Sequence, residues 1–317
     1  MLRLIAVRLL SAIPVLLLVT LIAFFLMRMV PGDPTIVMGG LQSTPQEREA
    51  IRQALGLDQP QHVQLWRWLS GLARGDLGRS VLLGTDVTTA AAARLPVTFS
   101  IAIYAFVLTL VVGVVAGVVA ALRHDTWVDR LLMTVSVIGV SLPNFWLALM
   151  LVVLFAVQLR WLPSGGYVPF MDDPLGWLRS ATLPAVALAL LQMGLLARIT
   201  RSTMLEVLNQ DYIRTARAKG LSAFKVVVKH AFTNTLIPVL TTVGHIFSLL
   251  MGGSIVIETV FSIPGFGLLL GSAILSRDYP VIQGGLLLFA VMLVALNIVI
   301  DLIYARLDPR IRYGHEG

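Results

Sequence analysis

Six long stretches without any Asp, Glu, Lys or Arg dominate this 317-residue sequence. They run over Leu9–Met27, Pro96–Leu122, Leu131–Leu159, Ser180–Ala197, Ala231–Ile257 and Tyr279–Ile300. Each has 18 or more residues, and about 20 residues of α-helix cross a hydrocarbon core roughly 30 Å thick. Because lipid offers the backbone no hydrogen-bond partner, such segments cross a membrane as helices. The sequence therefore predicts an all-α membrane protein with six transmembrane helices.

The overall composition agrees with this class. Hydrophobic residues make up 57% of the chain and charged residues 13%, against roughly 45–50% and 25% in soluble domains. The first stretch is longer than the core of a secretory signal and ends without a small-residue cleavage pattern, so we interpret it as a retained helix. The chain contains no cysteine, which leaves neither disulfides nor thiolate metal sites. The net charge of +7 is explained by membrane topology and does not indicate nucleic-acid binding.

Basic residues are distributed unevenly among the loops. With the N-terminus in the cytoplasm, the cytoplasmic segments hold 14 basic residues and the short external loops hold three. The other seven lie between Arg28 and Arg94, a segment long enough to be translocated whatever its charge. Since short cytoplasmic loops are enriched in Lys and Arg, we expect both termini to lie in the cytoplasm.

The segment 31–95 predicts a small helical domain on the external side, between the first two membrane helices. Thr44-Pro-Gln-Glu47 has the pattern of a capping box with proline at the first helical position, so a helix is expected to run to about Leu55 and end at Gly56. A second helix is expected near Gln61–Ala73. The predicted organisation is a first membrane helix in 1–30, this external cap in 31–95, a five-helix core in 96–306 with a cytoplasmic loop at 205–230, and a cytoplasmic tail in 307–317.

Four polar groups lie within or at the end of the predicted spans. Ser141-Leu-Pro-Asn144 interrupts the third stretch, because proline removes a backbone hydrogen bond and Asn144 needs a partner or water. Gln192 lies in the fourth span, His245 lies in the fifth, and Glu258 closes the fifth externally. Groups at such depth usually face the bundle interior or a water path. All four are therefore candidates for a translocation path, although a hydrogen bond between helices would explain His245 equally well.

After Glu258, the glycine- and proline-rich segment Phe261-Ser-Ile-Pro-Gly-Phe-Gly267 predicts a break in the helix. A chain broken in this way can re-enter the membrane as a gate or pore wall. Earlier in the chain, Gly113-x-x-x-Gly117 predicts the close approach of two helices.

The loop between the fourth and fifth spans is strongly basic and contains all three lysines of the chain. Asp211 or Asn209 is expected to cap a helix through Lys219, and Gly220 suits a left-handed turn at its end. Ser222 can cap a second helix that runs into the fifth span. These signals predict a helix–glycine–helix elbow in the cytoplasm. From charge alone, a solvated loop attracted to anionic lipid remains an equal alternative.

A family resemblance distinguishes between these alternatives. Tyr212-Ile-Arg-Thr-Ala-Arg-Ala-Lys-Gly-Leu221, with His230-Ala and Asn234-Thr-Leu-Ile-Pro238 downstream, resembles the cytoplasmic coupling loop of binding-protein-dependent ABC importer permeases. The broad motif of that superfamily reads Glu-Ala-Ala, three residues, Gly. Ala216 and Gly220 match it, whereas Arg214 and Thr215 replace the Glu and the first Ala, a departure typical of the peptide-importer branch.

Four further stretches are similar to the B-type permease subunit of dipeptide/oligopeptide importers. They are Pro31-Gly-Asp-Pro34, Trp66-Arg-Trp-Leu69 with Gly75-Asp-Leu-Gly-Arg-Ser80, Phe261-Ser-Ile-Pro-Gly265, and Arg277-Asp-Tyr-Pro-Val-Ile-Gln-Gly284 with Leu307-Asp-Pro-Arg310. The resemblance thus covers essentially the whole chain in order.

The resemblance implies the ABC importer permease fold in a bacterial cytoplasmic (inner) membrane. It implies a permease subunit that forms, with a second related permease, the pathway for dipeptides or oligopeptides delivered by an extracytoplasmic binding protein. Two ATPase subunits, or one fused ATPase, would bind ATP and Mg and drive transport. The residues expected to couple this chain to the ATPase are Asp211, Tyr212, Arg214, Thr215, Ala216, Arg217, Lys219, Gly220 and Leu221.

The chain itself is expected to be no enzyme, with no catalytic residue, metal or cofactor of its own. It lacks a G-x-x-x-x-G-K-[ST] phosphate loop, and it shows no H-E-x-x-H, G-x-S-x-G or paired intramembrane carboxylates. A stand-alone secondary transporter is a weaker alternative, because neither buried ion-coupling charges nor inverted repeats are evident. Within the importer class, glutathione or a nickel chelate remains an alternative solute.

Overall fold

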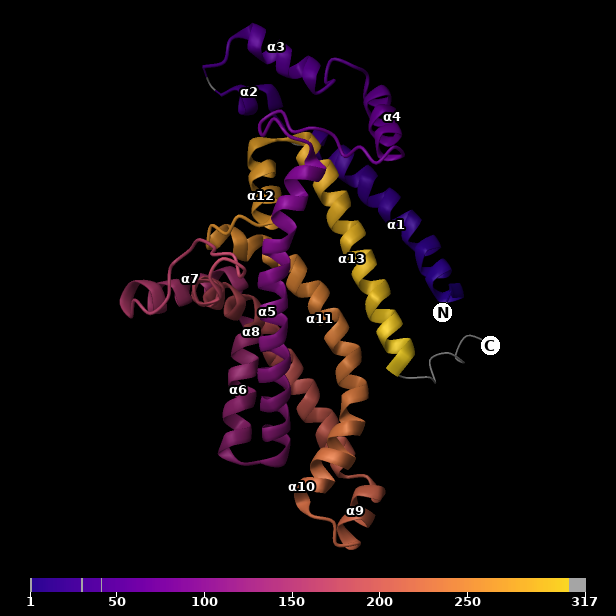
Figure 1. The fold of residues 1–317 in the computed structure, drawn as a ribbon, viewed down its shortest axis with the longest axis vertical. Helices are drawn as coiled ribbons and strands as arrows, with labels where there is room; N and C mark the ends of the chain where they lie inside the picture. Colours follow the sequence, from indigo (N-terminus) through magenta and orange to yellow (C-terminus); the bar gives the residue numbers. More distant parts are fainter. Residues whose placement is uncertain (1, 30, 41, 308–317) are drawn as a thin grey trace. The chain divides into compact units, whose positions relative to one another are not determined.

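Figure 1 shows the computed structural model of the chain, which describes residues 2–29, 31–40 and 42–307. Within these ranges the regular structure is helical, and the single isolated β-bridge joins Arg79 and Asp86. The predicted cytoplasmic tail lies outside the described residues apart from Leu307. The chain divides into two compact units, Met1–Pro96 with Pro264–Val299 and Val97–Ile263 with Ile300–Gly317.

Among the described residues, five helices are long and apolar enough to cross a membrane on their own. They are α1 (Leu2–Met29), α5 (Val87–Leu122), α8 (Pro174–Leu208), α11 (Thr233–Val260) and α13 (Tyr279–Leu307). A sixth span is obtained when the bent pair Trp127–Ser141 and Asn144–Gln158 is counted as one. The structure therefore agrees with the predicted all-α membrane class of up to six spans.

The third predicted span is not straight. It consists of α6 (Trp127–Ser141), α7 (Asn144–Leu151) and the π-helical segment η1 (Val152–Gln158), with a bend of 110° between α6 and the following pair. Proline lacks the N–H that the helix needs and disfavours helical backbone at the residue before it. Leu142 is accordingly extended, with φ −91° and ψ 134°. The interruption predicted at Ser141–Asn144 is confirmed.

The first unit contains the predicted cap, which consists of α2 (Pro34–Gly39), α3 (Pro45–Ala54) and α4 (Gln61–Leu72). The capping box is present, since Thr44 accepts from the Glu47 N–H and Glu47 accepts from the Thr44 N–H. Gly56 follows with φ +66°. Both helices predicted in this segment are therefore confirmed, because their start and stop signals are local in the sequence.

The first unit also contains α12 (Phe266–Ser276) and most of α13. Helix α11 ends at Val260 and α12 begins at Phe266, so the predicted break is confirmed. The loop that precedes α5 packs on the start of α13: a Cβ on Gly284 would lie 2.7 Å from the Leu77 carbonyl oxygen, and the Ser80 hydroxyl donates to Asp278. Residues 75–80 and 277–284, two of the stretches that resemble the peptide-importer permeases, are thus in contact.

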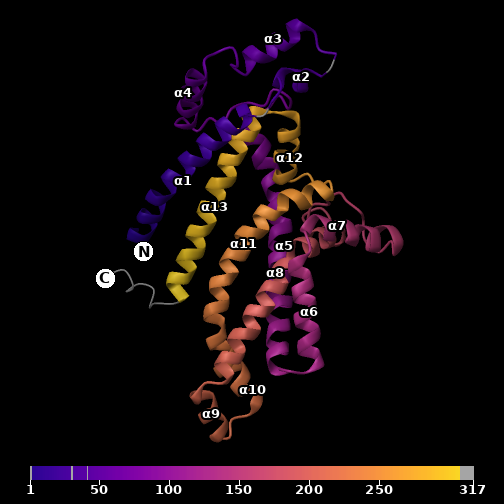
Figure 2. The ribbon, with the colours of Figure 1, turned by 180° about the vertical axis from the view of Figure 1, so that it is seen from behind.

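The second unit is built around α8, which packs against α6 and α11 (Figures 1 and 2). Its contact with α5 depends on two glycines. A Cβ on Gly113 would lie 3.1 Å from the Met193 carbonyl oxygen, and one on Gly117 would lie 2.5 Å from the Thr200 Cβ. The close helix approach predicted from Gly113-x-x-x-Gly117 is confirmed, because only glycine lets the two backbones come this near.

Between α8 and α11 the chain leaves the apolar bundle and forms α9 (Asp211–Ala218), α10 (Ala223–Lys225) and the π-helical segment η2 (Val226–Phe232). We call residues 209–225 the elbow. Figure 1 shows it at one end of the second unit.

Candidate functional site

The elbow turns at Gly220, which has φ +77°. The Gly220 N–H donates to the Arg217 carbonyl at 3.0 Å, and the Leu221 N–H donates to the Ala216 carbonyl at 3.3 Å. This nested pair of bonds is the Schellman motif, which ends a helix with a left-handed residue. The predicted left-handed turn is therefore confirmed, and the chain reverses toward Ser222.

The predicted start and end of this helix need correction. The N-cap of α9 is Gln210, whose side chain makes no capping bond. Asp211 is the first helical residue, and Asn209 caps the C-terminus of α8 instead. The helix ends at Ala218, because the Schellman turn already begins at Lys219. Ser222 does cap α10, through a long contact of 3.5 Å from the Lys225 N–H.

Helix α9 has one buried face. Ile213 and Ala216 are buried in a small cluster with Met204 of α8 and Val226 of η2. Of the predicted coupling residues, Ala216 belongs to this cluster, and the remaining ones are exposed: Asp211, Tyr212, Arg214, Thr215, Arg217, Lys219, Gly220 and Leu221. The apolar face therefore anchors the helix to its own chain, and the opposite face leaves cations and a tyrosine ring exposed.

A polar contact adds to this anchor. Asn234, near the start of α11, donates from Nδ2 to the Tyr212 hydroxyl oxygen at 3.0 Å and to the His230 carbonyl at 2.8 Å. Between these residues lies η2, and π-helical turns frequently occur at functional sites. Sequence reasoning missed this contact, because 22 residues separate the two side chains.

The four predicted path residues lie in the second unit, on α7, α8 and α11. His245 is exposed on α11, and its Nδ1 lies 3.1 Å from the Thr241 carbonyl oxygen. Asn144 is the first residue of α7, and its buried Oδ1 has no partner among the described residues. A Cβ on Gly253 of α11 would lie 3.6 Å from Asn144 Nδ2.

The other two path candidates are buried within the unit. Gln192 is 5% exposed, and its Oε1 also has no partner in the described part of the chain. Glu258 is fully buried and accepts a hydrogen bond from the Thr98 hydroxyl of α5 at 2.6 Å. In this conformation, His245 alone among the four has an exposed side chain.

A buried ion pair was not foreseen. Asp129 on α6 is 3% exposed and accepts two bonds from Arg201 on α8, from Nε at 2.6 Å and from Nη2 at 2.7 Å. The Asp125 N–H donates to the same carboxylate at 3.1 Å. His124 and Asp125 lie close to Asp129, but both Asp129 oxygens are already bound. The sequence offered one signal for this pair: an acidic residue lies just before one uncharged stretch and a basic residue just after another.

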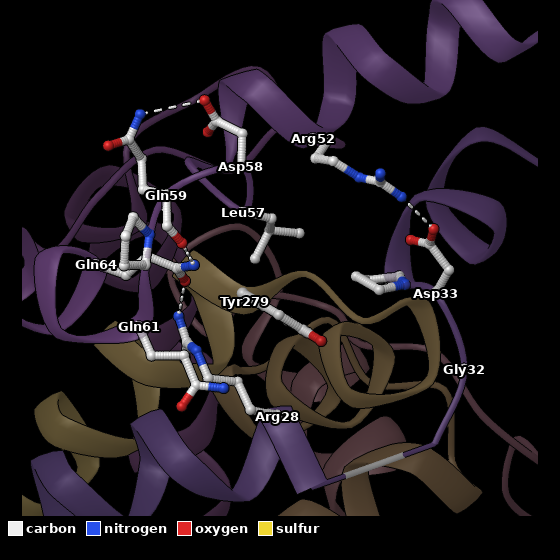
Figure 3. A pocket seen from close by; sticks show the side chains of 12 residues that line it. Arg28, Gly32, Asp33, Arg52, Leu57, Asp58, Gln59, Gln61, Gln64 and Tyr279 are labelled. Carbon is white, nitrogen blue, oxygen red and sulfur yellow. Dashed lines mark hydrogen bonds and ion pairs between the residues drawn. The ribbon is translucent and has the colours of Figure 1, made fainter.

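A cavity of about 550 Å³ lies in the first unit, lined by the end of α1, the cap and the start of α13 (Figure 3). Its charged side chains are already paired: Arg28 donates to Gln64 and the Phe24 carbonyl, and Arg52 contacts Asp33 at 2.5 Å. Figure 3 shows Gln64 continuing this network to Gln59. The lining is thus a structural joint of the cap, in which Arg52 and Asp33 form an ion pair while Arg28 and Asp58 are hydrogen-bonded to glutamine side chains.

Of the acidic residues that line this cavity, Asp33 accepts the most hydrogen bonds. Its carboxylate accepts from the Thr35 hydroxyl at 2.8 Å and from the Thr35 N–H at 2.9 Å. These bonds and the Arg52 charge stabilise the ionised form, so they hold the pKa of Asp33 below its usual value. The Thr35 hydroxyl is the largest single cause.

Two protein-family models and several known proteins match nearly the whole length of this chain. The family described as "Binding-protein-dependent transport system inner membrane component" matches residues 113–313, and its N-terminal companion family matches residues 1–102. A putative peptide transport system permease protein of Brucella abortus (strain 2308) is 55% identical over 313 residues, which cover 99% of this chain and 100% of the relative.

Two further relatives cover nearly the whole chain. A probable peptide ABC transporter permease protein of Sinorhizobium fredii is 43% identical, over 96% of this chain and 98% of its own. A glutathione transport system permease protein of Escherichia coli (strain K12) is 41% identical, over 99% and 100%. A solved amino acid ABC transporter overlaps 70% of this chain and 94% of its own at 13% identity, with a TM-score of 0.49.

The matched families span both compact units, and the apolar helices place the protein in the inner membrane as an integral component of a larger transport complex. Within such complexes the permease is the subunit without catalytic activity. The chain belongs to the binding-protein-dependent transport system inner membrane component family and is a permease subunit of an ABC importer.

Proposed function

We propose that this permease imports dipeptides or oligopeptides, which an extracytoplasmic binding protein delivers. A second related permease subunit completes the pathway, and two ATPase subunits or one fused ATPase supply ATP and Mg. The peptide assignment is supported by relatives named for peptide transport at 55% and 43% identity. Glutathione is the second candidate solute, because a relative named for it is 41% identical over nearly the same length.

The exposed face of the elbow is the observation that carries the coupling proposal. Helix α9 is held to its own chain by Ile213 and Ala216, and Gly220 turns the chain back toward α11. The predicted coupling residues thereby stand together on a short, rigid projection. A compact helix with a basic exposed face suits a groove on an acidic partner. The two ends of the elbow lead into α8 and, through η2, into α11. Movement of the ATPase would thus be transmitted to two membrane helices.

The membrane orientation remains part of this proposal. The charge distribution supports a cytoplasmic location for the elbow and both termini and an external location for the cap. Because the chain has no cysteine, single cysteines at Gln53 in α3 and at Ser222 in the elbow provide a direct test. An impermeant thiol reagent added to sealed cells should label Gln53→Cys but not Ser222→Cys. External labelling of Ser222→Cys would refute the orientation.

For the solute path, we propose that Asn144 and His245 approach the route, whereas Gln192 and Glu258 support it from inside the bundle. Asn144 lies at a helix break with an unpartnered oxygen, and His245 lies on an exposed helix face. Gln192 and Glu258 are enclosed by neighbouring helices. Apolar replacement of the first two should therefore alter transport, while replacement of the second two should chiefly lower stability.

The decisive experiment for the function is solute uptake by the complete complex. The permease pair, the ATPase and the binding protein are reconstituted in proteoliposomes with ATP inside, and uptake of labelled dipeptides, longer peptides and glutathione is compared. ATP-dependent accumulation of peptides, with little accumulation of glutathione, is the expected result. Preferential uptake of glutathione would replace the peptide assignment, and uptake without ATP would contradict the importer mechanism.

A further inference from the structure

The exposed residues of α11 form one continuous stripe. Apart from Thr233 at its N-terminus, the exposed positions whose side chains are described are Asn234, Pro238, Thr241, His245, Leu249, Gly252, Val256 and Thr259. Successive members are separated by three or four residues, the spacing that places side chains on one face of an α-helix. The opposite face, with Ile246, Leu250 and Ile257, is buried in the core of the second unit.

This stripe differs chemically from the exposed face of α5 in the same unit. From Ile101 to Leu122, the exposed residues of α5 are all aliphatic: Ile103, Val107, Val111, Val112, Val115, Val119 and Leu122. Such a face suits contact with lipid. Five of the eight stripe positions on α11 are instead Asn, Thr, His or Gly. Polar side chains at membrane depth face protein or water, so the α11 face is not a lipid-facing surface.

The side chains along the stripe favour a water-filled route over a tight helix contact. Closely packed membrane helices commonly carry small residues four apart, as at Gly113 and Gly117 of α5. On the α11 stripe, Gly252 has Leu249 and Val256 as its exposed neighbours instead. A Cβ built on Gly252 would meet no atom of the described chain within 4 Å, so the chain itself leaves this level of the stripe uncovered.

His245 provides a defined chemical group on this face. A carbonyl oxygen can only accept, so the 3.1 Å contact between Nδ1 and the Thr241 carbonyl places the ring proton on Nδ1. With Nδ1 carrying the proton, Nε2 is the acceptor of the neutral form of the ring. In the described part of the chain Nε2 has no hydrogen-bond partner. A peptide carries N–H donors in its backbone and at its amino terminus, which match this acceptor.

We propose that the α11 stripe forms one wall of the aqueous solute route and that His245 Nε2 accepts an N–H group of the passing peptide. This inference rests on the importer function proposed above. It adds which helix face lines the route and which atom contacts the peptide. The polar stripe extends from Asn234, which touches the elbow, to Thr259 near the other end of α11. One helix thereby carries both the coupling contact and the route wall.

The wall is tested by thiol labelling, which requires no knowledge of the solute. Single cysteines are placed on the stripe at Thr241, His245, Leu249 and Gly252, with Val107, Val111 and Val115 of α5 as matched controls. Each variant is assembled into the complete complex and exposed to a small water-soluble methanethiosulfonate, which reacts with hydrated thiolates. Labelling of the stripe positions at least about tenfold faster than the α5 positions is expected. Leu249→Cys is the most informative position, since the native residue there is apolar.

Equal, slow labelling of both sets would overturn the route assignment. The α11 face would then be a dry contact, and disulfide cross-linking of the same cysteines to the second permease would identify it. Because labelling is measured without transport, an incorrect peptide assignment leaves this result unchanged. Failure of the proposed function and failure of this inference are therefore distinguishable.

The contact atom is tested by transport at saturating peptide-loaded binding protein. His245→Leu removes the acceptor, and loss of one hydrogen bond is expected to slow the maximal rate about threefold to tenfold. His245→Gln restores an acceptor and should recover most of that rate, while Val111→Leu on α5 serves as the control for an exposed membrane position. The half-saturating concentration of binding protein should stay constant, because docking occurs elsewhere. A maximal rate in His245→Leu equal to that of the wild type would refute the His245 contact.

Discussion

The Asn234 side chain at the start of α11 donates a hydrogen bond to the Tyr212 hydroxyl oxygen on α9, at 3.0 Å. This contact spans the Schellman turn and the π-helical segment that otherwise separate the two helices. It links the exposed face of α9 directly to α11. If α9 couples to an ATPase as proposed, this contact gives its displacement a direct connection to α11.

Removing this bond should weaken coupling more than assembly. Tyr212→Phe removes the acceptor and Asn234→Leu removes the donor, and each is expected to reduce stimulation of ATP hydrolysis by loaded binding protein about threefold to tenfold. If the pair acts through one bond, the double variant should be no worse than the single variants, which a double-mutant cycle measures. Additive losses would show that the two side chains act separately.

Gly220→Val should uncouple the complex while leaving it inserted. The position has φ +77° and open space around a built Cβ, so the penalty arises from backbone conformation and not from a clash. Asn tolerates the left-handed region far better than a β-branched residue. Gly220→Asn is therefore the matched control and should retain most ATPase association in pull-down assays. Full transport by Gly220→Val would indicate that the elbow is only a solvated basic loop.

Gly117→Val should separate α5 from α8. A Cβ at this position would lie 2.5 Å from the Thr200 Cβ and 2.6 Å from the Ala197 carbonyl oxygen, both attached to helix backbone. Overpacking of this kind costs roughly 1–3 kcal/mol, which should lower the thermal midpoint of the detergent-purified complex. Gly252→Ala, where a Cβ meets nothing within 4 Å, should leave that midpoint unchanged or slightly raise it. Equal midpoints for wild type and Gly117→Val would contradict the described contact.

The Asp129–Arg201 pair should be needed for stability. Arg201→Leu leaves a buried carboxylate without its partner, and breaking a buried pair in this way costs about 3–5 kcal/mol. Arg130→Leu is the control, because Arg130 is exposed and makes one long bond of 3.4 Å to the Asp125 carbonyl. The yield and thermal stability of the purified chain measure the difference. Replacing both partners, as Asp129→Leu with Arg201→Leu, should recover part of the loss.

Acidification should loosen the start of the cap through Asp33. Because folding holds the pKa of this carboxylate below its usual value of 3.8, the stabilisation is present above about pH 4 and is lost as the pH falls through the lower folded value. Hydrogen exchange of residues 34–54, corrected for intrinsic rates, should show protection at neutral pH that declines in strong acid. Asp33→Asn should already be less protected at neutral pH and depend less on pH. Identical profiles would contradict the role of the carboxylate.

The features that the sequence predicted well depend on neighbours close in the chain. Uncharged stretches long enough to span lipid, the capping box at Thr44, the break at Pro143 and the left-handed Gly220 are all encoded within a few residues. Their physics is local, since backbone hydrogen bonding, proline geometry and the absence of a Cβ act on the residue itself. Family membership also followed from such short stretches, because their order along the chain is specific.

Only the tertiary structure decided which polar groups meet. Asp129 and Arg201 are 72 residues apart and Thr98 and Glu258 are 160 apart, so no local pattern pairs them. The stripe of α11 could be assigned only from the structure, in which α8 covers the opposite face of the helix. Gln192 and His245 looked alike as polar residues within spans, yet one is buried and the other exposed. The difference arises from helix packing, which sets the environment of each side chain through residues remote in the sequence.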